Sequence, residues 1–318
     1  MITTAFIIKF IVAAVAAGTP LLFGTVGEIL SEKVGHLNLG VEGMMAIGAV
    51  AGFAAGYATS NLAIAMAAAF LAGMFAALIY AVLTIGFMAN QNVIGLTLTI
   101  FGVGLSNFIG VYMVGHTNSV NWQLPAALIG QMKNVHIPVL SDLPVVGPLL
   151  FSYDPFTYVG IFFALVCGYY LFRTKMGLNT QAIGENPSAA DAATIRVTHL
   201  KYFNILLGGG ICGIGGAYCS MIINGGIWIS DCVGGLGWIA VALVIFASWK
   251  PHMAILGSFV FGGLRILKYY MPAVIPMAFF DMLPFVITAV VLLVASIRGA
   301  KSSHIPEYLG MNYFREER

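Results

Sequence analysis

Residues 173–201, RTKMGLNTQAIGENPSAADAATIRVTHLK, form the one long charged interruption in a chain that is otherwise strongly apolar. The stretch separates two long apolar runs. It carries four of the chain's 14 basic residues, which are Arg173, Lys175, Arg196 and Lys201. Its Asn186-Pro187 pair is typical of a helix start. We therefore expect a bundle of apolar helices, with residues 173–201 as its working loop.

The composition places the chain in a lipid bilayer. Of its 318 residues, 60% are hydrophobic and only 8% charged, and the mean hydropathy is +0.95. Soluble proteins carry about 25% charged residues. Apolar runs of roughly 20 residues, enough to cross about 30 Å of hydrocarbon, recur along the whole length. The predicted fold class is therefore all-α, a polytopic transmembrane helical bundle with residues 1–318 in one domain. The net charge of +2 gives no indication of a nucleic-acid partner.

Hydropathy predicts about nine membrane spans, within an expected range of about eight to ten. They cover approximately residues 5–30, 41–58, 62–88, 93–114, 155–172, 202–223, 235–249, 252–270 and 279–298. The first run has no clean signal-peptide cleavage site and is expected to stay as a helix. Residues 115–154 are rich in proline and polar residues and are expected to form a loop or re-entrant segment. Some spans should be broken, because non-helical backbone is tolerated in a membrane where protein or water covers it.

The basic residues predict the orientation. Four of the 14 lie on one side of the predicted topology: Lys9, Lys133, Arg265 and Lys268. The other ten lie on the opposite side: Lys33, Arg173, Lys175, Arg196, Lys201, Lys250, Arg298, Lys301, Arg315 and Arg318. Cytoplasmic segments carry the excess of lysine and arginine. Residues 173–201 and the C-terminus are therefore expected in the cytoplasm, and the 115–154 loop is expected outside the cell.

A dense polar motif, GHLNLGVEG at 35–43, lies between the first two spans. Its glycines and Asn38 favour a tight turn. Glu42 is expected in the first turn of the second helix, where the helix dipole favours an acid. On these residues alone, an ordinary turn at the membrane surface is the simpler interpretation.

Four longer strings resemble one family of membrane proteins. They are EILSEKVGHLNLGVEGMMAIGA at 28–49, LSDLPVVGPLLF at 140–151, AIGENPSAADAATI at 182–195 and GLGWIAVALVIFASWKPHMAILGSFVFGGL at 235–264. Each is similar, in the same order, to a segment of the permease subunits of bacterial ABC importers for nucleosides and simple sugars. These permeases form the branch of the branched-chain amino acid/ribose-type superfamily that works with basic-membrane-lipoprotein binding components. The resemblance covers most of the chain, and His36 and Cys232 depart from it.

The resemblance implies a multi-pass subunit of the bacterial inner membrane that translocates a nucleoside, with a simple sugar or riboflavin as the alternative substrate. It also implies three protein partners: an ABC ATPase subunit, a second and related permease forming a heterodimer, and an extracellular substrate-binding lipoprotein. ATP and Mg²⁺ would be bound by the ATPase, so the resemblance implies no cofactor in this chain.

In such permeases a cytoplasmic loop carries a short coupling helix that docks on the ATPase. Asn186 is a suitable N-cap, Pro187 suits the first helical position, and residues 188–193 are small and helix-prone. Asp191 is expected near the favourable start of this helix. On the residues alone, an incidental capped helix in a connecting loop is an equal alternative. The resemblance assigns ATPase coupling to Gly184, Glu185, Asn186, Pro187, Ala189, Ala190 and Ala193.

Polar groups inside apolar spans are candidates for a translocation pathway, because they are costly in lipid unless they pair or line water. The candidates are Asn38, Asn92, Asn107, Asn204, Asn224, Trp228 and Trp238. Amide edges and aromatic faces would suit a nucleoside base. The alternatives are an interhelical hydrogen bond for each asparagine and an interfacial anchor for each tryptophan.

The remaining motifs argue against an enzyme. GGGICG at 208–213 fits GxGxxG, but it follows no strand, so close helix packing through the small residues near it is favoured. The sequence contains no GxxxxGK[ST], HExxH or GxSxG. The four cysteines lack metal-binding spacing. We expect no catalytic residue and no metal site, with ATP hydrolysis in a separate subunit.

A secondary carrier driven by ions is the alternative from another functional class. Carriers of that class usually need ionisable groups near the membrane midplane. Here Glu28, Glu32 and Glu42 are expected near the ends of their helices instead, which favours the ATP-driven importer.

Overall fold

The structure, a computed structural model, describes residues 4–116, 121–135, 138, 141, 143, 145–270, 277–297 and 305–314. Within these ranges the elements are helical, and a single antiparallel bridge joins Gln123 to Ile227. The predicted all-α fold is confirmed. Parts of the predicted 115–154 loop, together with Arg298, Lys301, Arg315 and Arg318, lie outside the described residues.

Thirteen α-helices are described in these ranges: α1 Thr4–Lys33, α2 Val41–Thr59, α3 Leu62–Ala81, α4 Gln91–His116, α5 Ala126–Gln131, α6 Val146–Leu150, α7 Pro155–Arg173, α8 Lys175–Glu185, α9 Pro187–Ala192, α10 Val197–Tyr218, α11 Leu236–Phe246, α12 Pro251–Ile266 and α13 Met277–Ile297. Two π-helical turns, η1 Val82–Gly86 and η2 Cys219–Ile223, extend α3 and α10, and a 3₁₀ turn, η3 Leu267–Tyr269, follows α12.

Six helical segments among the described residues are long and apolar enough to cross a membrane. They are Phe6–Lys33, Val41–Thr59, Leu62–Gly86, Gln91–His116, Pro155–Arg173 and Val197–Ile223. The other three predicted spans coincide with α11, α12 and α13. The 11 residues of α11 rise only about 16 Å, roughly half of the hydrocarbon thickness. The expected broken span is therefore found at residues 235–249.

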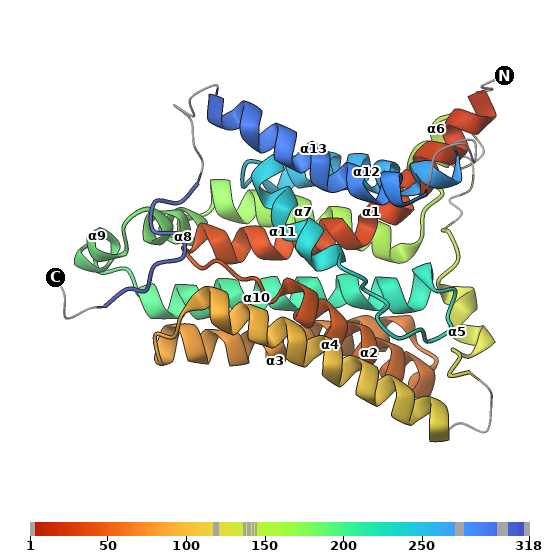
Figure 1. Cartoon of the computed structure of the whole chain (residues 1–318), viewed down its shortest axis with the longest axis horizontal. Helices are drawn as coiled ribbons and strands as arrows, with labels where there is room; N and C mark the ends of the chain where they lie inside the picture. Colours follow the sequence, from red (N-terminus) through yellow and green to blue (C-terminus); the bar gives the residue numbers. More distant parts are fainter. Residues whose placement is uncertain are drawn as a thin grey trace.

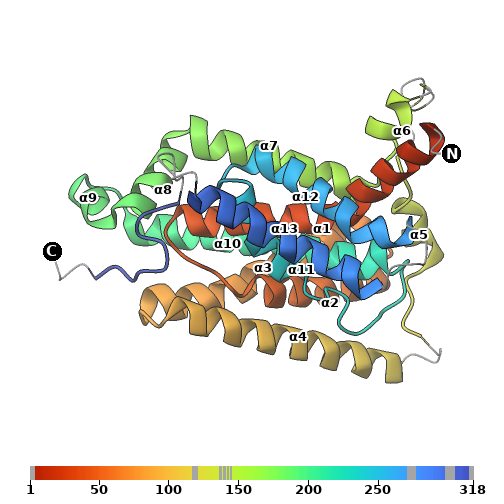
Figure 2. The same ribbon diagram turned by 45° about the horizontal axis from the view of Figure 1, so that its top comes forward.

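The long helices run side by side along the longest axis of the molecule (Figures 1 and 2). The start of α1, α5 and α6 lie at one end, here called the α5–α6 end. The helices α8 and α9 lie at the opposite end with residues 305–314, here called the C-terminal strap. The predicted working loop and the described part of the C-terminus thus share one end of the bundle.

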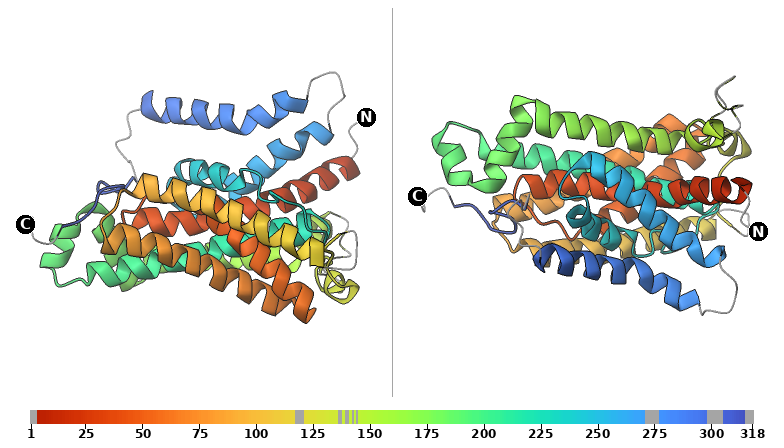
Figure 3. Two further views of the ribbon diagram at one scale, coloured as in Figure 1. Left: turned by 60° about the horizontal axis from the view of Figure 1, so that its bottom comes forward. Right: turned by 90° about the horizontal axis from the view of Figure 1, so that it is seen from above.

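The helix α10 forms the centre of the bundle. In its apolar 18-residue segment 83% of the residues are buried, whereas the corresponding share is 33% in the spans that contain α3, α4 and α7. It packs on α1, α2 and α3. Glycines make this packing close: a Cβ on Gly213 would overlap the backbone of α3, and one on Gly216 would overlap that of α2. The sequence prediction of close helix packing is confirmed. Figure 3 places α13 along the outside of the bundle, where it contacts α11 and α12.

Two helices begin inside the bundle rather than at either end. After α1 ends at the α8–α9 end, residues 34–40 turn back, and α2 starts about midway along the long axis (Figure 1). After η2, residues 224–235 also turn back, and α11 starts in the same central region. The chain thereby brings two helix starts and two non-helical segments together in the interior.

Candidate functional site

The helices α8 and α9 form a corner at Asn186. Thr174 starts α8 by accepting a hydrogen bond on Oγ1 from the Gly177 amide at 3.1 Å. The backbone N–H of Asn186 closes α8 by donating to the Ala182 carbonyl, and its Oδ1 opens α9 by accepting from the Ala189 amide at 2.9 Å. The predicted N-cap, with proline at the first helical position, is confirmed.

The helix α9 is only six residues long and offers one free face. Pro187 and Ala190 are buried. Its exposed residues Ser188, Ala189 and Ala192 are small, as is the exposed C-cap residue Ala193. Thr194 ends the helix with a positive φ of 64°. The outward surface is therefore smooth and lacks long side chains that would hold a partner away.

The predicted coupling residues divide by burial. Gly184, Pro187 and Ala190 are buried, whereas Glu185, Asn186, Ala189 and Ala193 are exposed. Asp191 lies in the last turn of α9, not near its start, and its Oδ2 accepts a hydrogen bond from the Tyr313 hydroxyl at 3.0 Å. The dipole argument for Asp191 was therefore wrong, because α9 ends one residue after it.

The C-terminal strap connects this corner to the rest of the bundle. The Tyr308 amide donates to the Gly184 carbonyl at 2.9 Å, and the Gly310 amide donates to the Gly35 carbonyl at 3.1 Å. Further along, the Asn312 amide group donates to the Met88 carbonyl at 2.6 Å. One ten-residue segment thus touches α8, the α1–α2 connection and the η1–α4 connection.

The α1–α2 connection is held by side chains from several helices. The Leu37 amide donates to Oε1 of Gln91 at 2.9 Å, and its carbonyl accepts from the Tyr80 hydroxyl at 2.8 Å. The Asn38 amide donates to Oε1 of Glu28 at 2.8 Å, and Thr99 donates to the Leu39 carbonyl at 2.9 Å. Non-helical backbone inside a membrane protein needs such internal partners, because lipid provides none.

Glu42 links the two interior helix starts. It lies in the first turn of α2, as predicted, and is 4% exposed. Its two carboxylate oxygens accept hydrogen bonds from the amides of Gly235 at 2.8 Å and Gly237 at 2.6 Å, at the start of α11. Gly237 permits this contact, since a Cβ there would lie 2.5 Å from the Glu42 Cα. One carboxylate therefore lies at the positive N-terminal ends of both α2 and α11.

The predicted pathway residues lie in different surroundings. Asn38, Asn204 and Trp228 are buried, Asn107 and Asn224 are half-buried, and Asn92 and Trp238 are exposed.

Two of the asparagines join separate elements. Asn204 donates to Oγ1 of Thr180 at 3.1 Å and so connects α10 with α8. Asn107 accepts from the Asp231 amide at 2.8 Å and connects α4 with residues 224–235. These are contacts of the interhelical kind that the sequence left as the alternative.

Trp228 belongs to an aromatic cluster towards the α5–α6 end. Its ring centroid lies 5.4 Å from those of Phe53 and Trp122, and its amide donates to the Trp122 carbonyl at 2.9 Å. The cluster packs against α4, because a Cβ at Gly110 would overlap the Trp228 ring. The cluster therefore joins α2, which carries Phe53, to the segment before α5, which carries Trp122.

The contacts of the side chains at the centre of the molecule were only partly predictable from the sequence. Glu42 was assigned to its own helix, and nothing in the sequence indicated that it also binds the start of α11. The only indication in the sequence was that Glu42, an acid, lies in the glycine-rich segment 35–43 between two apolar runs. Among the described residues, no group of three or more His, Cys, Asp or Glu side chains could hold a metal ion.

Residues 10–294 match the model of a family described as the permease component of branched-chain amino acid transport systems. The chain belongs to this family. It is thus a transport component and a polytopic membrane protein, as the resemblance of its four strings implied.

Three relatives are similar over most of their length. TsgC13 of Haloferax volcanii, named as a candidate glucose ABC transporter permease, is 36% identical over 80% of this chain and 75% of its own. The nucleoside ABC transporter permease NupC of Lactococcus lactis subsp. cremoris is 33% identical over 94% of each chain. The guanosine ABC transporter permease NupQ of Bacillus subtilis is 30% identical over 88% of this chain and 89% of its own.

Proposed function

We propose that this permease is the membrane-spanning subunit of an ATP-driven importer that carries a nucleoside into the cell. The observation that carries the proposal is α9, a capped helix at one end of the bundle whose exposed residues are all small. A separate ATPase subunit could approach the backbone of such a helix closely. ATP and Mg²⁺ would be bound by that subunit.

The contacts of the C-terminal strap suggest how motion of α9 would reach the interior. A displaced α9 would move α8, and the strap is hydrogen-bonded to α8 at Gly184 and to the α1–α2 connection at Gly35. That connection leads directly into α2, whose Glu42 binds the start of α11. Opening and closing of the ATPase would thereby move the two interior helix starts against each other.

A nucleoside is the preferred substrate because NupC aligns over 94% of each chain and NupQ is named for guanosine. A simple sugar is the second candidate, since the relative from Haloferax volcanii is named for glucose. Riboflavin is a further alternative, because its ribityl chain has the hydrogen-bonding groups of a sugar. Uptake measured with all three solute classes, in vesicles containing the complete transporter, distinguishes them.

We place the α8–α9 end in the cytoplasm of a bacterial cell and the α5–α6 end outside, where a substrate-binding lipoprotein would deliver the solute. Support comes from Lys33, Lys175 and Arg196, which all lie at the α8–α9 end. An excess of basic residues is typical of the cytoplasmic side.

A second, related permease is the remaining proposed partner, in a heterodimer. The outer face of α4 carries a row of exposed apolar residues that lipid or such a subunit would cover: Val93, Leu96, Ile100, Phe101, Phe108 and Val111.

The coupling role is tested by Ala189→Glu and Ala193→Glu, which add a bulky charge to the exposed face of α9. Both should abolish solute-stimulated ATP hydrolysis and uptake by the complex reconstituted in vesicles. The matched control is Ala127→Glu, an exposed alanine on the short helix α5 at the opposite end. Normal uptake in the two α9 variants, with the membrane protein correctly folded, would contradict the proposal.

A further inference from the structure

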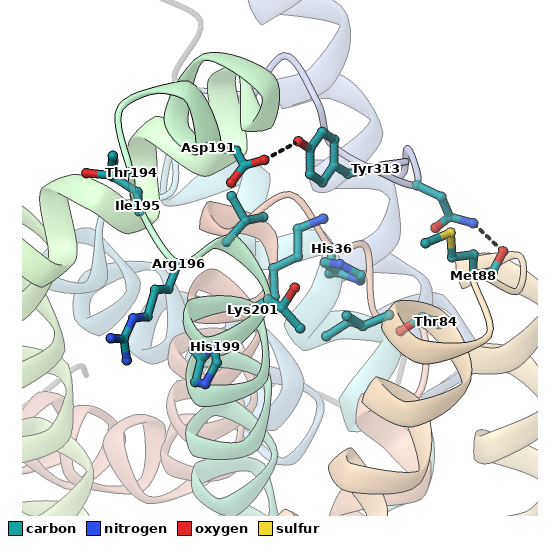
Figure 4. Close-up of a pocket in the computed structure, with 14 residues that line it drawn as sticks. His36, Thr84, Met88, Asp191, Thr194, Ile195, Arg196, His199, Lys201 and Tyr313 are labelled. Carbon is teal, nitrogen blue, oxygen red and sulfur yellow. Dashed lines mark hydrogen bonds between the residues drawn. The ribbon is translucent and has the colours of Figure 1, made fainter. Parts of the chain in front are cut away.

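A cavity of about 730 Å³ lies between the start of α10, α9, η1 and the C-terminal strap (Figure 4). Small-molecule sites in proteins typically measure about 300–1,000 Å³. The cavity is separate from the exposed face of α9 and from the Glu42 junction. Its size admits a metabolite rather than a single small ion.

Two buried polar side chains point into this cavity and towards one another (Figure 4). Lys201, on α10, is 4% exposed, and no described residue provides its ammonium group with a hydrogen bond or ion pair. His36, from the α1–α2 connection, is 1% exposed, and neither of its ring nitrogens has a hydrogen-bond partner in the described part of the chain. Burying such groups without partners is costly, so a ligand in the cavity that accepts hydrogen bonds from Lys201 and His36 would be stabilised.

The start of α10 adds a third source of positive potential. The first amides of a helix lack partners within the helix and carry the positive end of its dipole. Arg196, at the N-cap, makes no side-chain capping bond, and residues 196–199 line the cavity. An uncapped helix start beside a buried ammonium group is a typical arrangement for binding phosphate. The side chains of Arg196 and His199 point away from Lys201 in Figure 4, so we do not count them as ligands.

The opposite wall of the cavity is acidic and polar. Asp191 accepts a hydrogen bond from the Tyr313 hydroxyl at 3.0 Å, and Asn312 on the strap also lines the cavity. A carboxylate opposite the cationic group would repel a second anionic group but would accept hydrogen bonds from hydroxyl groups. The cavity therefore matches a ligand with a phosphate at one end and hydroxyl groups at the other.

We propose that this cavity binds a sugar monophosphate, either free or as part of a nucleotide. The phosphate lies against Lys201, His36 and the start of α10, and the sugar hydroxyls face Asp191. Burial and the nearby Lys201 charge lower the pKa of His36 well below its usual 6.5 when no ligand is bound, and the ring can donate a hydrogen bond to phosphate in either protonation state. Because α9 and the strap form part of the wall, a bound ligand would hold α9 in place and so connect transport to the level of phosphorylated product. That consequence rests on the proposed docking role of α9, whereas binding itself does not.

The test is calorimetric titration of the purified full chain in phospholipid-free micelles. The probes are ribose 5-phosphate, adenosine 5′-monophosphate, inorganic phosphate and adenosine. We expect at least one sugar phosphate to bind about tenfold or more tightly than inorganic phosphate and adenosine. Binding of adenosine 5′-monophosphate without ribose 5-phosphate identifies a nucleotide as the ligand. Binding of both shows that a free sugar phosphate is sufficient. Equal binding of adenosine and its monophosphate, or no binding below about 1 mM, would overturn the proposal.

Variants make the assignment specific. Lys201→Gln should weaken binding about tenfold or more, and Lys201→Arg should retain it within a few-fold. Lys175→Gln removes an exposed charge from the same end and should change nothing. If circular dichroism finds Lys201→Gln misfolded, His36→Leu replaces it and should weaken binding several-fold. Unchanged binding in folded Lys201→Gln or in folded His36→Leu refutes the site. If the wild-type chain binds the ligand but Ala189→Glu and Ala193→Glu leave uptake normal, only the proposed function fails.

Discussion

Replacing Glu42 by alanine should destabilise the fold where α2 meets α11. The carboxylate is 4% exposed and accepts two hydrogen bonds, at 2.8 and 2.6 Å, from Gly235 and Gly237. A hydrogen bond to a charged group contributes about 1.5–3 kcal/mol, so losing both would cost about 3–6 kcal/mol. Alanine also removes the cost of burying the carboxylate. We therefore expect a loss at the lower end, about 3 kcal/mol.

Glu42→Gln should have about half of this effect, because its NH2 group replaces one of the two accepting oxygens and cannot accept from an amide N–H. Unfolding of the purified chain by SDS in mixed micelles, followed by circular dichroism, measures the difference. The exposed Glu307→Ala is the control and should stay within about 0.5 kcal/mol of the wild type. If Glu42→Ala unfolds together with this control, Glu42 does not hold the start of α11.

Three further predictions concern pH, topology and packing. Burial and a neighbouring lysine lower the pKa of His36, so below pH 6.5 the unfolded chain takes up a proton that the folded chain does not. The free energy of unfolding should therefore fall as the pH drops below 6.5, by up to about 1.4 kcal/mol per unit, and His36→Gln should remove that part of the slope. A cysteine at exposed Ser188 should react with an impermeant maleimide only from the cytoplasmic side, and one at exposed Asn121 only from outside; the opposite pattern would invert the proposed orientation. Gly216→Ala forces a Cβ into the backbone of α2 and should cost several kcal/mol in the same SDS assay, about 3 or more. Gly104→Ala, with no heavy atom within 4 Å of its Cβ, should be neutral or slightly stabilising, and equal effects of the two would refute the packing argument.

The corner between α8 and α9 at Asn186 was largely predictable from the sequence because its determinants are local. The cap at Asn186 and the helix start at Pro187 depend on residues that are neighbours in the chain. Burial of Ala190 was not predictable, because the same small residue suits either face of a helix. It faces inward because the chain continues from α9 into α10, and the Ile195 amide donates back to the Ala190 carbonyl at 3.0 Å.

The sequence by itself determined that this protein is a bundle of membrane helices, because its apolar runs have no soluble alternative and lipid requires their backbone to bond internally. It also located the capped helix at residues 187–192. Only the tertiary structure decided what happens between the spans. Glu42 binds the start of α11 although about 190 residues separate them, and Lys201 and His36 meet at one cavity. Such contacts depend on where the chain turns back inside the bundle. The position of each turn depends on how glycines and helix starts that are distant in the sequence pack together. No local sequence pattern predicts that packing.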